Sequence, residues 1–115
     1  MKSNLSLNYL ILRLLTEFEM VSWMKTRLLP HTGEDDLILE IVVFIGTCAS
    51  DESAAIYLCK SNILPSLIEL LKAKQEDDEI VLQVIYVFYQ LCSHAASRQY
   101  VKVRNEDRCQ PLLYI

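Results

Sequence analysis

The chain has 115 residues, of which 52% are hydrophobic and 23% are charged, and its formal net charge is −4. This length allows one domain at most. The acidic balance argues against a nucleic-acid partner, because phosphate binding needs a basic surface. Two glycines and three prolines leave few turn positions, which favours helices over many short strands.

Neither a signal peptide nor a membrane-inserted segment is expected. Met1–Leu15 holds an apolar patch, but Arg13 interrupts it and no small-residue cleavage site follows. The longest run without Asp, Glu, Lys or Arg is Ile80–Ser97, whose length approaches a membrane span. Four polar residues make that span a poor one: Gln83, Gln90, Ser93 and His94. We interpret the run as a buried core helix.

Apolar residues recur at helical spacing from Tyr9 onward. Residues 1–8 are polar, and we expect them to form a disordered tail. The spacing predicts a first helix over Tyr9–Glu19, with Leu12, Leu15 and Phe18 on its buried side.

A second and a third helix follow. The second is predicted over Met20–Leu29, where Trp23 either completes the core or covers the N-terminal end of the fold. Its inward positions are Val21, Met24 and Leu28. Residues 30–33 form a loop, because proline ends a helix and glycine allows positive φ. The third and longest helix is predicted over Glu34–Cys48.

The second half of the chain repeats this order. Ser53 is predicted to cap a helix over Ala54–Lys60. Asn62 marks the entry to a helix ending at Lys74, because asparagine tolerates the left-handed conformation. The next helix is predicted over Glu76–Cys92, and Ala95–Val103 begins another. The long helix carries a buried stripe at Ile80, Val84, Val87, Phe88 and Leu91.

The two halves align at an offset of 43 residues without a gap. Glu34-Asp35 pairs with Asp77-Asp78, and Leu37–Val42 pairs with Ile80–Ile85. A period near 40 residues with three helices per unit indicates an all-α, armadillo- or HEAT-type solenoid. The units are residues 9–48 and 53–92, followed by a partial repeat and C-terminal tail over 95–115.

Two repeats and a fragment are fewer than a solenoid normally needs, and neither end carries the polar cap that such arrays require. We therefore expect the chain to be a piece of a longer array. If it exists alone, we expect the exposed apolar repeat ends to drive self-association.

Several segments resemble the C-terminal armadillo repeats of the kinesin-associated protein family, the non-motor subunit of heterotrimeric kinesin. They are Asp35–Glu40, Ile45–Thr47, Lys60–Leu71, Gln75–Glu79 and Ile85–Gln90, and the resemblance runs from about Leu14 to about Val101. The family usually has glycine where Asn62 stands and proline where Ser22 stands.

The resemblance implies a right-handed superhelix that acts as a non-catalytic adaptor. It implies kinesin motor subunits and cargo adaptors as partners, and a role in microtubule-based and ciliary (intraflagellar) transport. The implied location is the cytoplasm, the microtubules and the cilium. The alternative is a generic armadillo or HEAT scaffold that binds peptides and is unrelated to motors.

One stripe of each long helix is less apolar than the rest. On the second it comprises Glu79, Gln83, Tyr86 and Gln90, and the 43-residue offset predicts Asp36, Glu40, Val43 and Thr47 on the first. The stripe is either a solvated helix face or a groove that binds an extended partner segment. Groove-binding armadillo families use an asparagine near the end of this helix to hold the backbone of the partner. This chain has Thr47 and Gln90 at those positions, which weakens the case for peptide binding by a row of asparagines.

Two acidic runs, Glu34–Asp36 and Glu76–Glu79, stand at the start of successive long helices. Carboxylates at a helix N-terminus suit the helix dipole, at about 0.3–1 kcal/mol each. That effect accounts for one or two charges better than for four. We therefore expect Asp36, Asp77, Asp78 and Glu79 to contribute to a negative ridge that attracts a basic partner segment.

The four cysteines, Cys48, Cys59, Cys92 and Cys109, have no paired short spacing, and we expect free thiols. Cys92 and His94 are too close along a helix for a zinc pair, so no metal or cofactor is expected.

A small cysteine-dependent α/β enzyme is the competing interpretation, with Cys48 as nucleophile, His94 as base and Asp51 as orienter. It is disfavoured because Cys48 aligns with Leu91, a core position, in the repeat register. We expect no enzyme.

Overall fold

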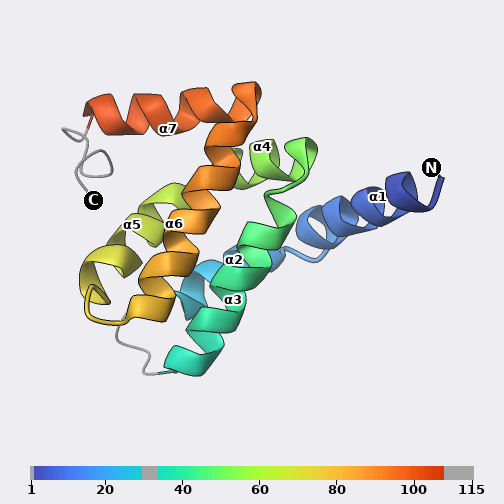
Figure 1. The fold of residues 1–115 in the computed structure, drawn as a ribbon. Helices are drawn as coiled ribbons and strands as arrows, with labels where there is room; N and C mark the ends of the chain where they lie inside the picture. The colour runs from blue at the N-terminus through green and yellow to red at the C-terminus, as the bar shows by residue number, and fades with distance from the viewer. Residues whose placement is uncertain (1, 30–33, 108–115) are drawn as a thin grey trace.

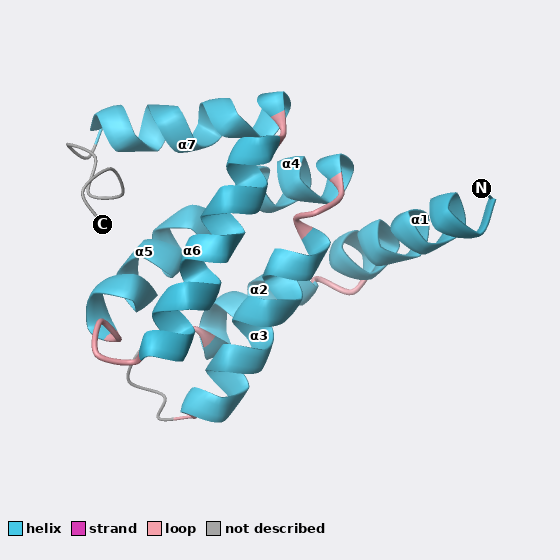
Figure 2. Cartoon of the chain, in the orientation of Figure 1, coloured by secondary structure: helices cyan, strands magenta, loops and turns pink. Residues whose placement is uncertain are grey.

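A computed structural model of the protein describes the backbone of residues 2–29 and 34–107, and the side chains of 7–29 and 34–101. Throughout these residues the secondary structure is helical, without a strand (Figure 2), so the all-α prediction is confirmed. The helices are α1 (Lys2–Glu17), α2 (Met20–Arg27), α3 (Asp35–Cys48), α4 (Glu52–Lys60), α5 (Ile63–Ala73), α6 (Asp78–Ser93) and α7 (Ala95–Asp107).

The helices pack in three rows, with one helix of each predicted unit in every row. The first row is α1, α4 and α7, where α4 contacts both neighbours, and the second is α2 against α5. The third row is α3 against α6, the most extensive helix contact of the molecule. Both helices of this row begin at the lower end of Figure 1 and run upward side by side. This arrangement is consistent with a helical-repeat fold.

The backbone repeats the same unusual conformation at the 43-residue offset. Glu19 (φ 52°) and Asn62 (φ 66°) precede α2 and α5, and both are left-handed. Within the described backbone, no other non-glycine residue has positive φ. The conformation expected at Asn62 is confirmed, and its recurrence at Glu19 shows that the two units turn in the same way between their first and second helices.

The predicted apolar stripes form the core. On α6 the expected positions Ile80, Val84, Val87, Phe88 and Leu91 are all buried. Leu67 and Leu71 of α5 join them in one cluster with residues of α1 to α4. Each fully buried aliphatic side chain contributes about 1.5–3 kcal/mol by leaving water, so this shared cluster stabilises the stack.

Polar contacts also join the units. The Lys25 ammonium donates to the Ser61 carbonyl oxygen (3.1 Å), which connects α2 to the turn before α5. A ring nitrogen of His94 lies 2.9 Å from the Ala49 carbonyl oxygen, so the start of α7 is fastened to the end of α3.

The first helix differs from its prediction in extent and in orientation. It begins at Lys2, so residues 2–8 are helical and the expected disordered tail is wrong for them. Phe18 was expected to be buried, yet it is 68% exposed just beyond the end of α1. Leu15 is buried as expected. The chain turns at Glu19 to enter α2, which leaves Phe18 outside the α1–α2 contact.

The ends of three later helices also differ from their predictions. Asp51, rather than Ser53, caps α4 by accepting a hydrogen bond from the Ala54 N–H (3.0 Å). Asp77 caps α6, which therefore begins two residues later than expected. The last helix continues to Asp107 instead of ending at Val103. The predicted loop over 30–33 and the tail over 108–115 lie outside the described residues.

Among the described residues, no one helix combines the length and the apolar character of a membrane span. The α4–α5 pair meets these criteria only when taken together, and it is bent by 81° at its break.

Candidate protein-interaction face

The N-termini of α3 and α6 bring the two acidic runs to the same end of the molecule (Figure 1). Asp35 and Asp36 occupy the first turn of α3, and Asp78 and Glu79 occupy that of α6. Because the two helices are parallel neighbours, these carboxylates form the acidic ridge that the sequence predicts. We define the acidic ridge as residues 34–36 and 76–79.

Not every carboxylate of the acidic ridge is free to meet a partner. Asp77 accepts a hydrogen bond from the Ile80 N–H (3.2 Å), so its side chain is used to cap α6. Asp35 pairs with the Lys74 ammonium at 2.9 Å, across the boundary between the two units. The Lys74 side chain is 20% exposed and that of Asp35 is 49% exposed, so this pair adds at most about 1 kcal/mol. Asp36, Asp78 and Glu79 remain exposed to solvent.

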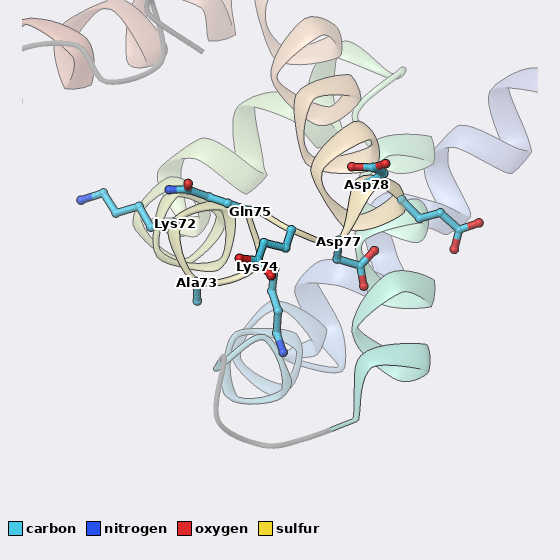
Figure 3. Close-up of a pocket in the computed structure, with 8 residues that line it drawn as sticks. Lys72, Ala73, Lys74, Gln75, Asp77 and Asp78 are labelled. Atoms are coloured by element: carbon cyan, nitrogen blue, oxygen red, sulfur yellow. The ribbon is translucent and has the colours of Figure 1, made fainter.

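An open hollow of about 670 Å³ is lined by residues 72–79, so residues 76–79 of the acidic ridge form part of its wall. Figure 3 shows that its side chains diverge: Lys72 points away from the loop on one side and Asp77 on the other. Small-molecule sites need polar groups that converge on one point. The hollow is therefore the concave side of the connection from α5 to α6 rather than a ligand pocket.

The predicted stripe of α3 and α6 lies at the surface. Its α3 residues Asp36, Glu40, Val43 and Thr47 are all exposed. On α6, Glu79 and Tyr86 are exposed, and Gln83 and Gln90 are partly buried. We call these eight residues the α3–α6 face. The Thr47 hydroxyl already donates to the Val43 carbonyl oxygen (3.0 Å), which reduces its use as a donor to a partner.

Tyr86 joins the two helices at the centre of the α3–α6 face. A Cβ atom added to Gly46 would lie 3.0 Å from the Tyr86 ring, so the ring packs directly on the α3 backbone. The Gln90 amide donates to the Tyr86 hydroxyl (2.5 Å), and the Tyr89 ring stacks 6.3 Å away. Sequence reasoning overlooked this use of Gly46. The available signal was an isolated glycine within a helical pattern, which often marks close packing.

The thiols and His94 do not form a nucleophilic site. Burial raises the pKa of Cys48 to about 11, with a smaller contribution from Asp51, so the thiol is protonated at neutral pH. The His94 ring is engaged with the Ala49 carbonyl oxygen. Burial likewise raises the pKa of Cys59 to about 11. Cys48, Cys59 and Cys92 are free thiols, whereas Cys109 lies outside the described residues.

Within the part of the chain that the structure describes, no group of three or more His, Cys, Asp or Glu side chains is placed to hold a metal ion.

Comparison with known families decides where the chain belongs. Residues 1–111 match the kinesin-associated protein (KAP) family. The chain belongs to the kinesin-associated protein family. The KAP match extends beyond the resemblance seen between about Leu14 and Val101, and it includes the whole of α1 and α7. No solved structure matches the chain.

KAP membership agrees with the all-helical architecture and with the protonated thiols, and these features together fit a protein that is not an enzyme. The acidic ridge and the α3–α6 face are the surfaces on which a partner-binding role can be examined.

Proposed function

We propose that the chain is a non-catalytic adaptor module that binds kinesin motor subunits and cargo adaptors. In this proposal it is an armadillo-type, right-handed superhelix that acts in microtubule-based and ciliary transport, in the cytoplasm and the cilium. Membership of the KAP family supports the link to kinesin. The three rows of equivalent helices support the repeat architecture.

We infer that the acidic ridge receives a basic segment of a partner. The observation that carries this inference is the parallel pairing of α3 and α6. It brings the carboxylates at the N-termini of both helices to the same end of the molecule. The acidic ridge has seven carboxylates, whereas two cations adjoin it, Lys72 in the last turn of α5 and Lys74 just after that helix. Each helix N-terminus adds about +0.5 charge. The carboxylates, the two lysines and the two helix N-termini together carry a charge of about −4. The surface therefore stays strongly negative although some carboxylates cap a helix or pair with a lysine.

The α3–α6 face extends this surface along the two helices. Tyr86 lies at its centre with a half-exposed ring, and Glu40 and Gln83 lie between it and the acidic ridge. An extended segment that places basic residues at the ridge would cross carboxylate, amide and aromatic groups in that order. Aromatic rings at the centre of an interface are frequent sites of binding energy.

The test is capture of kinesin motor subunits at several salt concentrations. The variant replaces Asp35, Asp36, Asp77 and Asp78 by asparagine, which retains the cap at Asp77 because asparagine caps as well as aspartate. We expect weaker capture at low salt and a flatter salt dependence, because exposed charges act mainly through screened attraction.

The matched control is the double variant Glu52→Gln and Glu69→Gln. Both carboxylates are exposed and neither belongs to the acidic ridge; Glu52 starts α4, beyond the opposite end of α3. Unchanged capture by the asparagine variant would mean that the carboxylates serve only the helix ends. The asparagine variant removes four charges and the control removes two, so a loss of binding free energy in the control about half that of the asparagine variant would mean that net charge alone matters.

A second arm compares this chain with a longer array of the family. Capture by both supports a binding role for these repeats, whereas capture by the long form only would make them structural. The alternative of a generic peptide scaffold predicts binding of basic peptides without capture of motor subunits.

A further inference from the structure

Three apolar side chains form a solvent-exposed stripe along α6. Leu82 (62% exposed), Ile85 (41%) and Tyr89 (67%) are spaced three and four residues apart, so they share one side of the helix. We call them the outer stripe. Asp78, four residues before Leu82, stands on the same side in the first turn of α6. The outer stripe therefore ends at a carboxylate of the acidic ridge.

The equivalent side of α3 shows what packs along such a stripe. The residues 43 positions before the outer stripe are Leu39, which is partly buried, and Val42 and Gly46, which are buried. Gly46 lies against Tyr86 and Val87 of α6, and the α3–α6 contact is the most extensive of the molecule. A parallel helix therefore packs along this side of the first long helix.

A lysine meets the acidic start of α3 in the same contact. Asp35, the equivalent of Asp78, pairs with the Lys74 ammonium at 2.9 Å, and Lys74 stands four residues before the start of α6. Asp78 is exposed, and among the described residues no cation pairs with its carboxylate. Asp78 thus has the position of Asp35 without the lysine.

The place beside the outer stripe is open in the described chain. In Figure 1, α7 leaves the upper end of α6 and joins the first row, where it packs on α4. The third row ends at α6 within the described residues. One helix along the outer stripe would lie beside α7 as α6 lies beside α4. A whole second copy of the chain does not fit, because its α1 would fall where α7 packs on α4 and α6.

We propose that the outer stripe docks one amphipathic helix of a partner protein, parallel to α6, with a lysine or arginine just before its first turn. Charge complementarity selects this partner, because Asp78 lacks the cation that Lys74 supplies to Asp35. The rest of the acidic ridge lies at the same end and adds to the attraction. Tyr89 stands where α3 has Gly46, so the docked helix needs a small residue opposite the ring.

The inference goes beyond the proposed adaptor role. The α3–α6 face is proposed to receive an extended segment, whereas the outer stripe, on the adjoining side of α6, receives a helix. The two surfaces share the negative end of α6, but docking on the outer stripe requires neither a motor subunit nor a cargo adaptor.

Fluorescence anisotropy with two labelled synthetic peptides tests the proposal. Each peptide is an amphipathic helix of leucine, alanine and glutamine with two lysines, placed before the first turn in one and after the last turn in the other. Composition and charge are identical, so a difference in affinity reports the orientation of the docked helix. We expect the peptide with N-terminal lysines to bind about two- to fivefold more tightly, as one exposed ion pair allows. The helix dipole favours lysines at the C-terminus, so peptide helicity cannot cause this preference.

Variants of the chain locate the peptide. Leu82→Gln with Ile85→Gln should weaken binding about tenfold or more, because two apolar contacts are lost. Asp78→Asn should abolish the preference between the two peptides. Glu79→Gln is the matched control, because it removes the same charge from the same helical turn on the adjoining α3–α6 face, and the preference should persist. Leu14→Gln removes an exposed leucine of α1 and should leave binding unchanged.

Four results would overturn the proposal. Equal binding of the two peptides would exclude a charge pair that orients the helix. Binding that survives the double glutamine variant would place the peptide elsewhere, and an equal loss with Leu14→Gln would indicate non-specific hydrophobic association. No binding of either peptide would mean that another part of this chain or a second copy covers the outer stripe, which sedimentation velocity distinguishes. Because the probes are synthetic, these outcomes are independent of the capture of kinesin motor subunits.

Discussion

The two three-helix units of this chain, α1–α3 and α4–α6, follow the same backbone path but have different neighbours. Glu19 and Asn62 have the same left-handed conformation, although only asparagine suits it well. Val42 is fully buried, whereas its counterpart Ile85 is 41% exposed. The comparison shows that the repeat sets the path of the chain. The neighbour that is present on each side decides which residues become core.

The largest expected effect comes from placing a charge at these two equivalent positions. Val42→Asp buries an unpaired carboxylate between α3 and its neighbours, and we expect a loss of about 4 kcal/mol or more, or no folding. Ile85→Asp should cost about 1 kcal/mol at most, because its side chain already contacts water. Urea unfolding of both variants at low protein concentration measures the difference. Equal losses would show that Ile85 is as well covered as Val42 in the isolated chain.

Leu15→Ala and Leu58→Ala sharpen the same comparison within the first row. Both leucines are fully buried, and they lie 43 positions apart on α1 and α4. Each truncation should cost about 2–5 kcal/mol through lost burial and a cavity. Leu58→Ala should cost more, because α4 is packed between α1 and α7 and can collapse less easily. Denaturant curves give the free energy of unfolding of each variant. A larger loss for Leu15→Ala than for Leu58→Ala would contradict the prediction.

Removing the residue before the long helix should lower the free energy of unfolding more in the second unit than in the first, but by a smaller amount than the core substitutions. Asp77→Ala removes the bond to the Ile80 N–H and should lower the free energy of unfolding by about 1 kcal/mol. Glu34 occupies the equivalent position before α3 and makes no side-chain cap bond. Glu34→Ala should therefore change stability by only a few tenths of a kcal/mol. Thermal melts of the two variants suffice, and a similar drop in both would contradict the difference in capping.

The smallest effect is a gain in stability at the left-handed turns. Glycine adopts positive φ without strain, so Glu19→Gly should stabilise the chain by about 0.5–1 kcal/mol. Asn62→Gly should change stability less, because asparagine tolerates this conformation. Midpoints of urea unfolding provide the measurement. A loss of stability on Glu19→Gly would show that the glutamate side chain makes a compensating contribution.

The candidate surface was predictable where it depends on helical period alone. Spacing places Glu79, Gln83, Tyr86 and Gln90 along one side of α6, and that side reaches the surface. The pairing of Lys74 with Asp35 was not predictable, because the two residues are 39 positions apart and meet only when the units stack. The burial of Gly46 beneath Tyr86 has the same origin.

The sequence by itself determined the helices, their turns and the repeat, because periodicity, Asn62 and the acidic helix starts act over a few neighbouring residues. Only the tertiary structure decided that Phe18 lies in water and that the two acidic runs adjoin. The physical reason is that burial depends on the distance between helices in space. A local pattern specifies which side of a helix is apolar, but the stacking of one unit on the next determines whether anything covers it.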